Sequence, residues 1–437
     1  MQRVLSFEQT PALTVPLRFF LTAPLFAAAA AVLLLWYGPE ALATRWSPAA
    51  LALTHLLTLG FLANVMAGAL LQILSVVAGI DIPRPRMTAA AIHTCLTLGT
   101  AALAAGFLLG SPLLFRTALP LLATAFGVLL FVCAVGLWRG PGRSDMITAI
   151  RFALAALAVT VVLGASAASV FAWALPIPLM RVVPLHLAWG LLGWVGLLII
   201  GVAYQVVPMF QVTPVYPASV TRWLSRVLFA ALGIWSVITV LSDGRHTLLN
   251  ALSSELLYGS FAVFGVTTLY LLWHRKRPKP DPTTLFWRAS LLSLLACMAL
   301  WIFGELLPQL ALARAFPFLL GTLFIVGFAG SAVNGMLYKI VPFLVWYHLQ
   351  NQLAGGCAKA PNVKQVLPDN VAQRQFRAHV AALVLLVGCA IWPRVLVYPA
   401  ALAFGLSSCW LWFNLMTAAR VYRRSLAQAP AAAHPQS

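Results

Sequence analysis

Residues 54–79 read THLLTLGFLANVMAGALLQILSVVAG, a stretch without Lys, Arg, Asp or Glu. A helix needs about 20 such residues to cross the hydrocarbon core of a bilayer. Backbone groups in lipid must be satisfied internally, so we expect this stretch to be helical. Comparable stretches recur and predict an all-α integral membrane protein with about twelve transmembrane helices. They lie near residues 17–37, 50–78, 88–110, 117–138, 147–173, 183–209, 221–241, 248–273, 286–307, 312–344, 379–393 and 395–419.

The composition supports this class of protein. Hydrophobic residues make up 62% of the chain and charged residues 8%, which is more apolar surface than a soluble core could bury. The net charge of +19 would suggest a nucleic-acid partner in a soluble protein, but here the basic residues are spread between apolar stretches. The expected partner is therefore the lipid bilayer and not nucleic acid. The six cysteines show no C-x-x-C spacing and are expected to pack between helices.

The basic residues also predict the orientation. Alternate loops hold 22 of the 28 Lys and Arg residues, and the other loops hold 6. Because basic loops stay in the cytoplasm, we expect both termini there, in an inner (cytoplasmic) membrane of the bacterial type. The chain, 1–437, is then one transmembrane domain, with a cytoplasmic loop at 346–378 and a flexible cytoplasmic tail at 421–437.

Three of the predicted helices share a pattern. The second is quoted above, the sixth reads HLAWGLLGWVGLLIIGVAYQVVPMFQVTP, and the tenth ends GSAVNGMLYKIVPFLVW. A Gly-x-x-Tyr-x-x-Val-Pro motif ends at Pro208 and again, 134 residues later, at Pro342, while the corresponding Ser75 lies 133 residues before Pro208. This spacing predicts three four-helix units in a pseudo-threefold arrangement. The alternative is that Gly and Pro are simply common in membrane helices.

Two histidines are the main candidates for chemistry. His55 and His186 both lie near the outer ends of helices that run in the same direction, so they should sit at similar depth. Two imidazoles at matched depth can ligate one haem iron, or one haem and one copper. The alternative is a hydrogen bond across a helix interface. His93 is a weak candidate because it lies towards the other side. The other histidines are expected to be solvated near loops or in the tail: His246, His274, His348, His379 and His434.

The region around His55 resembles known membrane proteins. The second helix of subunit I of the haem-copper oxidases, in which a histidine ligates the low-spin haem, is similar to Thr54-His55, Gly60-Phe61, Gly68 and Val76-Val77-Ala78-Gly79. The chain resembles more closely the NnrS family, twelve-helix proteins that contain haem and copper and are linked to nitric oxide stress. Leu53 stands where that family has a further histidine, and Ser75 replaces a proline.

The resemblance implies a haem-binding protein of the haem-copper oxidase superfamily that acts in electron transfer or in nitric oxide response. His55 would hold haem b, and His186 would be the second axial ligand or would bind a nearby copper; a quinol or a cytochrome would donate electrons. The histidine motifs of the oxidase copper site are absent, so we do not expect a proton-pumping terminal oxidase, and an enzymatic role stays open. The alternatives are a multi-pass transporter or permease, or a cofactor-free partner in respiratory-complex assembly.

Overall fold

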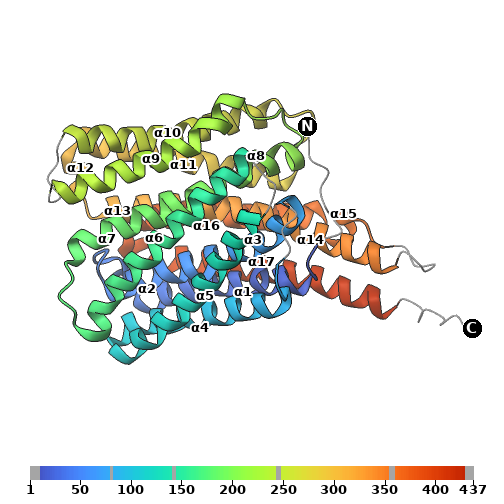
Figure 1. The fold of residues 1–437 in the computed structure, drawn as a ribbon, viewed down its shortest axis with the longest axis horizontal. Helices are drawn as coiled ribbons and strands as arrows, with labels where there is room; N and C mark the ends of the chain where they lie inside the picture. The colour runs from blue at the N-terminus through green and yellow to red at the C-terminus, as the bar shows by residue number, and fades with distance from the viewer. Residues whose placement is uncertain (1–9, 79–81, 140–143, 243–247, 354–359, 429–437) are drawn as a thin grey trace, which may run out of the picture.

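The computed structural model describes residues 10–78, 82–139, 144–242, 248–353 and 360–428. These residues form helices and no strand, and twelve of the helices are long and apolar enough to cross a membrane. The predicted fold class is therefore confirmed, and the protein is a multi-pass membrane protein in contact with lipid. Figure 1 shows the helices packed side by side in one bundle. Twelve crossings place the start of the first helix, Thr14, and the end of the last, Ala427, at the same end, which we call the terminal end.

The elements fall into three consecutive sets of four spans. The first set contains α1 (Thr14–Tyr37), η2 (Gly38–Leu42), α2 (Pro48–His55), η3 (Leu56–Ala63), α3 (Asn64–Ala78), α4 (Pro85–Leu109) and α5 (Pro112–Arg139). The second contains α6 (Asp145–Trp173), α7 (Leu179–Ala188), η4 (Trp189–Gly196), α8 (Leu197–Gln211), α9 (Ala218–Leu241) and α10 (Leu248–Trp273). The third contains α11 (Pro282–Leu306), α12 (Pro308–Leu312), α13 (Ala315–Gly321), η5 (Thr322–Gly330), α14 (Ser331–Leu353), α15 (Val363–Val366), α16 (Asp369–Ile391) and α17 (Pro393–Ala427).

The second span of each set contains a π-helical segment. The three segments, η3, η4 and η5, begin at Leu56, Trp189 and Thr322, which are 133 residues apart in both steps. The spans that carry them are also the most enclosed. In the 18-residue apolar stretch of each span, 78%, 72% and 56% of the residues are buried, against 28–50% for the other nine spans. A π turn is rare and is often found at functional sites. Its recurrence at constant spacing supports the predicted threefold repeat and places three equivalent helices inside the bundle.

A glycine in each π segment allows the first span of its own set to pack closely. A Cβ added at Gly60 would lie 2.4 Å from Phe26 Cγ on α1, and a Cβ added at Gly327 would lie 2.7 Å from Ser293 Cβ on α11. The equivalent glycine of η4, Gly193, approaches α6 in the same way. A larger side chain at these positions would force the two helices apart. The same pairwise packing is therefore repeated in all three sets.

The segment predicted as a loop, 346–378, is partly helical. α14 continues to Leu353, and α16 begins at Asp369 rather than at the predicted start, His379. The sequence pattern missed the first turns of α16 because their polar side chains interrupt the apolar period, although Asp369 in the first turn favours a helix start. α17 extends to Ala427, so the predicted tail begins helical, and its last residues, 429–437, lie outside the described residues.

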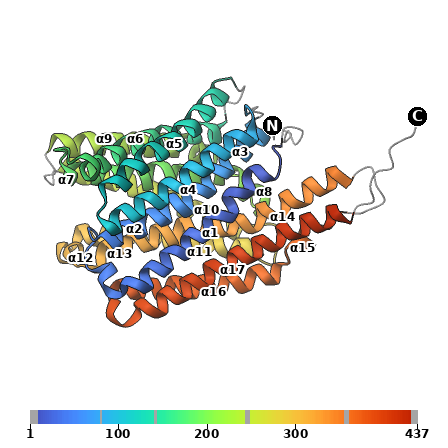
Figure 2. The same ribbon diagram turned by 90° about the horizontal axis from the view of Figure 1, so that it is seen from below.

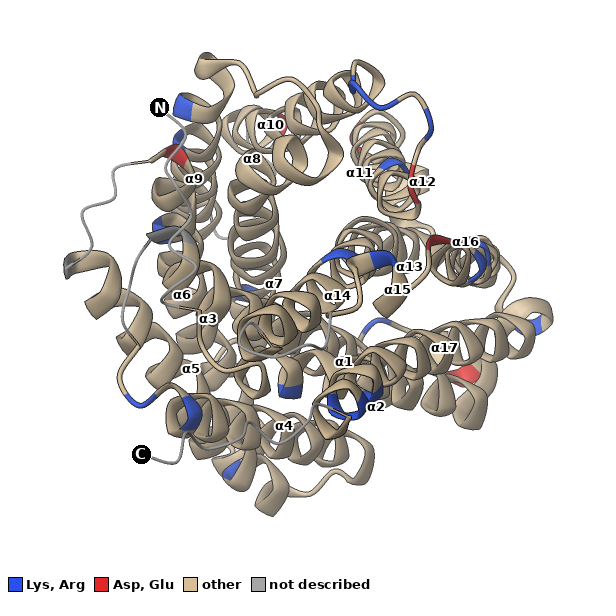
Figure 3. Ribbon diagram, turned by 90° about the vertical axis from the view of Figure 1, so that its right-hand side faces the viewer, with Lys and Arg blue, Asp and Glu red and all other residues tan. Residues whose placement is uncertain are grey.

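Charged residues gather at the ends of the bundle. Figure 3 looks at the terminal end and shows Lys and Arg, in blue, both on outer loops and near the middle of this face, beside α14. This is the end that the sequence predicts to be cytoplasmic. The opposite end, which we call the far end, carries α7, α12 and the start of α2 (Figure 1).

Candidate functional site

The two predicted site histidines lie at the junction of the first and second sets. His55 is the last residue of α2, directly before η3, and His186 lies in the last turn of α7, three residues before η4. The equivalent π segments thus place both histidines at similar depth, towards the far end. Their ring centroids are 6.4 Å apart, and the ring planes differ by 20°. The structure therefore brings together the two residues that the sequence singled out.

Backbone carbonyls hold both rings through the same nitrogen. His55 Nδ1 lies 2.8 Å from the Leu51 carbonyl oxygen, and His186 Nδ1 lies 3.0 Å from the Thr160 carbonyl oxygen on α6. A carbonyl can only accept, so each Nδ1 must carry a proton and donate it. In the neutral ring, Nε2 then has a free lone pair, which is the tautomer that metal ligation requires. No described residue forms a hydrogen bond with either Nε2 atom.

The surroundings of the pair are apolar. The Phe107 ring of α4 lies 5.3 Å from that of His55, between centroids, and packs edge-on against Phe115 and Phe171. On the other side, a Cβ added at Gly164 would lie 2.8 Å from His186 Cε1, so only glycine leaves room for the ring there. Both histidines are half-buried, as are all residues of the adjoining α6 segment 163–170, LGASAASV. Small side chains thus leave the rings reachable from the side.

The donor set fits a haem better than a bare metal ion. Two imidazoles on opposite faces of one metal have centroids about 6 Å apart, from two metal–nitrogen bonds of about 2.0 Å plus the distance from nitrogen to ring centre. The observed 6.4 Å is close to this value. Protein zinc sites use three or four protein ligands, and the described residues contain no group of three His, Cys, Asp or Glu placed to hold a metal. Haem instead brings its own equatorial nitrogens and needs only axial ligands.

His93, the weak candidate, is not part of this pair. It lies on α4, where its Nε2 is 2.8 Å from the Thr22 hydroxyl of α1 and its ring packs edge-on against Phe19. A hydrogen bond between two helices accounts for its place in the membrane.

His379 was wrongly expected to be solvated. It is 2% exposed and is the eleventh of the 23 residues of α16, so it lies at the middle of a span. Its Nε2 is 2.8 Å from the Ser331 hydroxyl, and its Nδ1 is 3.3 Å from Asn334 Nδ2. The sequence signal that could have revealed it is the polar face that Gln375 and His379 share at helical spacing before the apolar run of α16.

The comparisons with known proteins leave the family open. No protein-family model matches the chain, and no curated protein matches it significantly.

Proposed function

We propose that this protein binds a haem in the membrane through His55 and His186 and acts in electron transfer or in the handling of a diatomic gas such as nitric oxide. The observation that carries the proposal is the convergence of two imidazoles whose Nδ1 atoms are bonded to carbonyls and whose Nε2 atoms are free. The resemblance to the NnrS family supports nitric oxide as the gas, and the basic loops support the inner membrane as the location.

The residues of the chain would hold and tune the cofactor. The Leu51 and Thr160 carbonyls orient the two rings and keep Nε2 available, and a hydrogen bond to Nδ1 also raises the basicity of the ligand. Phe107 covers the His55 ring on the α4 side. When bound, the haem would supply one-electron transfer or gas binding at its iron.

A visible spectrum of the purified protein tests the proposal. With both histidines as axial ligands, the reduced wild type should show a six-coordinate low-spin haem. His55→Ala should lose haem, whereas His186→Ala should retain a five-coordinate haem that binds carbon monoxide. His93→Ala is the matched control, because this histidine belongs to the same set of spans as His55 but is bonded to Thr22, and the spectrum of the variant should equal that of the wild type.

Two results would overturn the proposal. Wild type that contains no haem after expression with ample iron and haem precursor would leave the transporter and assembly alternatives. A haem that survives in the His55→Ala and His186→Ala double variant would show that the haem is bound elsewhere.

A third result would change the role of His186. If the wild type already binds carbon monoxide, and His186→Ala loses copper but keeps haem, His186 serves a second metal. Purified protein with a quinol or cytochrome donor should not consume oxygen at oxidase-like rates.

A further inference from the structure

A basic loop joins α10 to α11 at the terminal end. It covers residues 274–281, which read HRKRPKPD, and Figure 3 shows its basic residues in blue at the upper right, next to α11. The loop follows directly on Trp273, which ends α10 and is 80% exposed, as is typical of a tryptophan at the membrane–water interface. The backbone nitrogen of Lys276 donates to the Val212 carbonyl at 2.9 Å, which holds the loop against the end of α8. Arg275 therefore lies at the depth of the lipid headgroups.

The Arg275 side chain uses only part of its hydrogen-bonding capacity. Its Nη1 donates to the Thr284 hydroxyl on α11. Its Nε and Nη2 are buried, and neither has a partner in the part of the chain that the structure describes. These two nitrogens lie along one edge of the planar guanidinium and donate in the same direction, which is how Arg binds two oxygens of one phosphate or carboxylate. A complete bidentate edge of this arginine is thus left unused.

A second unpartnered donor lies next to the same hydroxyl. Gln211, the last residue of α8, is fully buried, and its Oε1 accepts from the Thr284 hydroxyl at 2.6 Å. Its Nε2, on the same amide carbon, has no partner among the described residues. Because Arg275 and Gln211 both bond to one oxygen, their unpartnered nitrogens lie close together. We call these three residues, Gln211, Arg275 and Thr284, the donor site.

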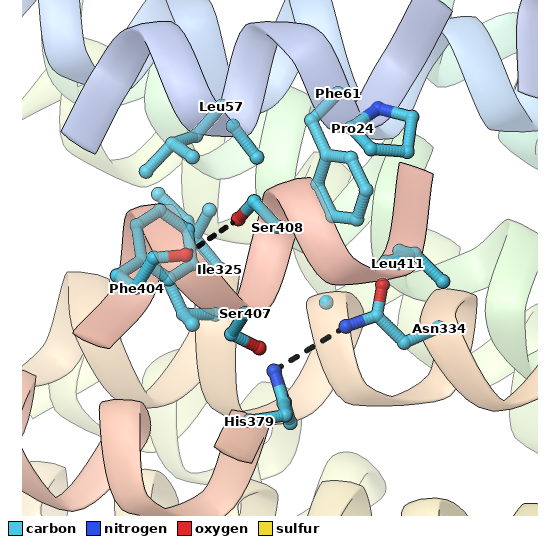
Figure 4. Close-up of a pocket in the computed structure, with 13 residues that line it drawn as sticks. Pro24, Leu57, Phe61, Ile325, Asn334, His379, Phe404, Ser407, Ser408 and Leu411 are labelled. Atoms are coloured by element: carbon cyan, nitrogen blue, oxygen red, sulfur yellow. Dashed lines mark hydrogen bonds between the residues drawn. The ribbon is translucent and has the colours of Figure 1, made fainter. Parts of the chain in front are cut away.

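The cavity in Figure 4 has the opposite requirement. There Asn334 Oδ1 is the unpartnered atom, and an amide oxygen can only accept. A buried water can donate to such an atom. The donor site has unpartnered N–H groups instead, so it needs a ligand that accepts several hydrogen bonds at once.

The charges near the donor site favour an anion as this ligand. The Asp281 carboxylate is close by, but it is paired with Lys339, whose Nζ lies 3.2 Å from Oδ2. Burial lowers the pKa of the Arg275 guanidinium, Asp281 partly offsets this, and the like charge of Arg277 lowers the pKa again. Positive charge is therefore in excess, and an anion would compensate it.

We propose that the donor site binds a phosphate group, either of an anionic lipid headgroup or of free phosphate, with Arg275 on two of its oxygens and the Gln211 amide beside them. Phosphate oxygens accept several hydrogen bonds each, and Arg pairs with them bidentately. A lipid would bring its phosphate to this depth from the bilayer, and free phosphate would enter from the aqueous side. The proposal does not depend on haem at the His55–His186 pair.

Titration of the purified full-length protein with two probes tests the proposal. In a neutral detergent, phosphatidylglycerol is added and the bound lipid is counted by native mass spectrometry, and inorganic phosphate is titrated by calorimetry. We expect the wild type to bind at least one probe saturably. Saturable binding of inorganic phosphate identifies free phosphate as a ligand, and binding of the lipid alone identifies the headgroup. Arg275→Lys keeps the charge but loses the bidentate edge, so it should weaken binding at least about tenfold.

Arg277→Lys is the matched control, because it makes the same exchange at an exposed position of the same loop. It should bind within about twofold of the wild type, since an exposed charge acts through solvent and is screened. Wild type that binds neither probe saturably would overturn the proposal, whether or not the variants fold. Equal losses in Arg275→Lys and Arg277→Lys would also overturn it, because they would indicate a diffuse basic surface without a built site.

Discussion

The His55–His186 pair and His379 all lie within the transmembrane bundle beside π-helical segments, but they differ in what their ring nitrogens contact. Each ring of the pair uses one nitrogen on a carbonyl and leaves the other free, at a half-buried position. His379 has both nitrogens bonded to side chains at a buried position. The contrast teaches that depth in the membrane alone does not define a ligand. The free nitrogen distinguishes a candidate ligand from a histidine held in a polar network.

The largest expected effect is the loss of unfolding free energy in His379→Ala, compared with His55→Ala in protein without haem. His379→Ala should lower the free energy of unfolding by about 3 kcal/mol, because it leaves a cavity and strips Ser331 and Asn334 of a buried partner. His55→Ala in haem-free protein should cost only about 1 kcal/mol, since it removes one hydrogen bond at a half-buried ring. Unfolding in mixed micelles, monitored by circular dichroism, measures both. Equal losses would erase the contrast between the two sites.

A smaller effect is expected at the glycine beneath His186. Gly164→Ala should displace the imidazole and cost about 2 kcal/mol, because the new Cβ would lie 2.8 Å from Cε1. If the pair binds haem, this variant should also weaken the six-coordinate spectrum. Gly127→Ala on α5 is the control, because an added Cβ there meets nothing within 4 Å. A normal spectrum and unchanged stability in Gly164→Ala would show that the ring is not confined from this side.

The smallest effect is expected at the terminal end, where Asp281 and Lys339 form a partly buried ion pair. Burial alone would raise the pKa of the Asp281 carboxyl, but Lys339, 3.2 Å away, and hydrogen bonds from Thr284 outweigh it and hold this pKa below its usual range. A lowered folded-state pKa stabilises the protein above the unfolded value of about 3.9, and the contribution is lost as pH falls through the folded-state pKa.

Asp281→Asn should therefore lower stability at neutral pH by about 1 kcal/mol and should reduce the loss on acidification. Thermal unfolding between neutral and strongly acidic pH measures this difference. A parallel pH dependence in wild type and variant would mean that Asp281 does not contribute to it. Lys364→Ala, which removes an exposed ion pair with Asp369, serves as a control with little expected effect.

The features of the fold that depend on apolar residues facing lipid could be predicted from the sequence. The spans, the 133–134-residue repeat and the similar depth of His55 and His186 could all be predicted from apolar runs and motif spacing. The distance between the two histidines could not, because it depends on Gly164 and on how α6 packs against α7. The π segments left no signal either, since their residues are as apolar as those of the flanking α-helices.

His379 shows how a polar helix end misleads. The residues before it, 369–378, include Asp, Asn, Gln and Arg. The apolar run of the predicted span therefore began only at His379, and the histidine was placed at the border of the predicted loop. In the structure these residues form the first turns of α16, and the histidine lies half-way along the helix. Helical spacing that continues from the polar residues 369–378 into the apolar run would have placed His379 within the membrane helix, whereas the apolar run alone did not.

The position of His379 at the midpoint of α16 has a further consequence for the ring itself. Its Nδ1 accepts from the Asn334 amide and its Nε2–H is donated to the Ser331 hydroxyl, so the two contacts select one tautomer. A second ring proton would have to displace the Asn334 amide and would place a charge with no acidic partner inside the bundle. Ser331 and Asn334 therefore fix the chemical form of the imidazole as well as its position.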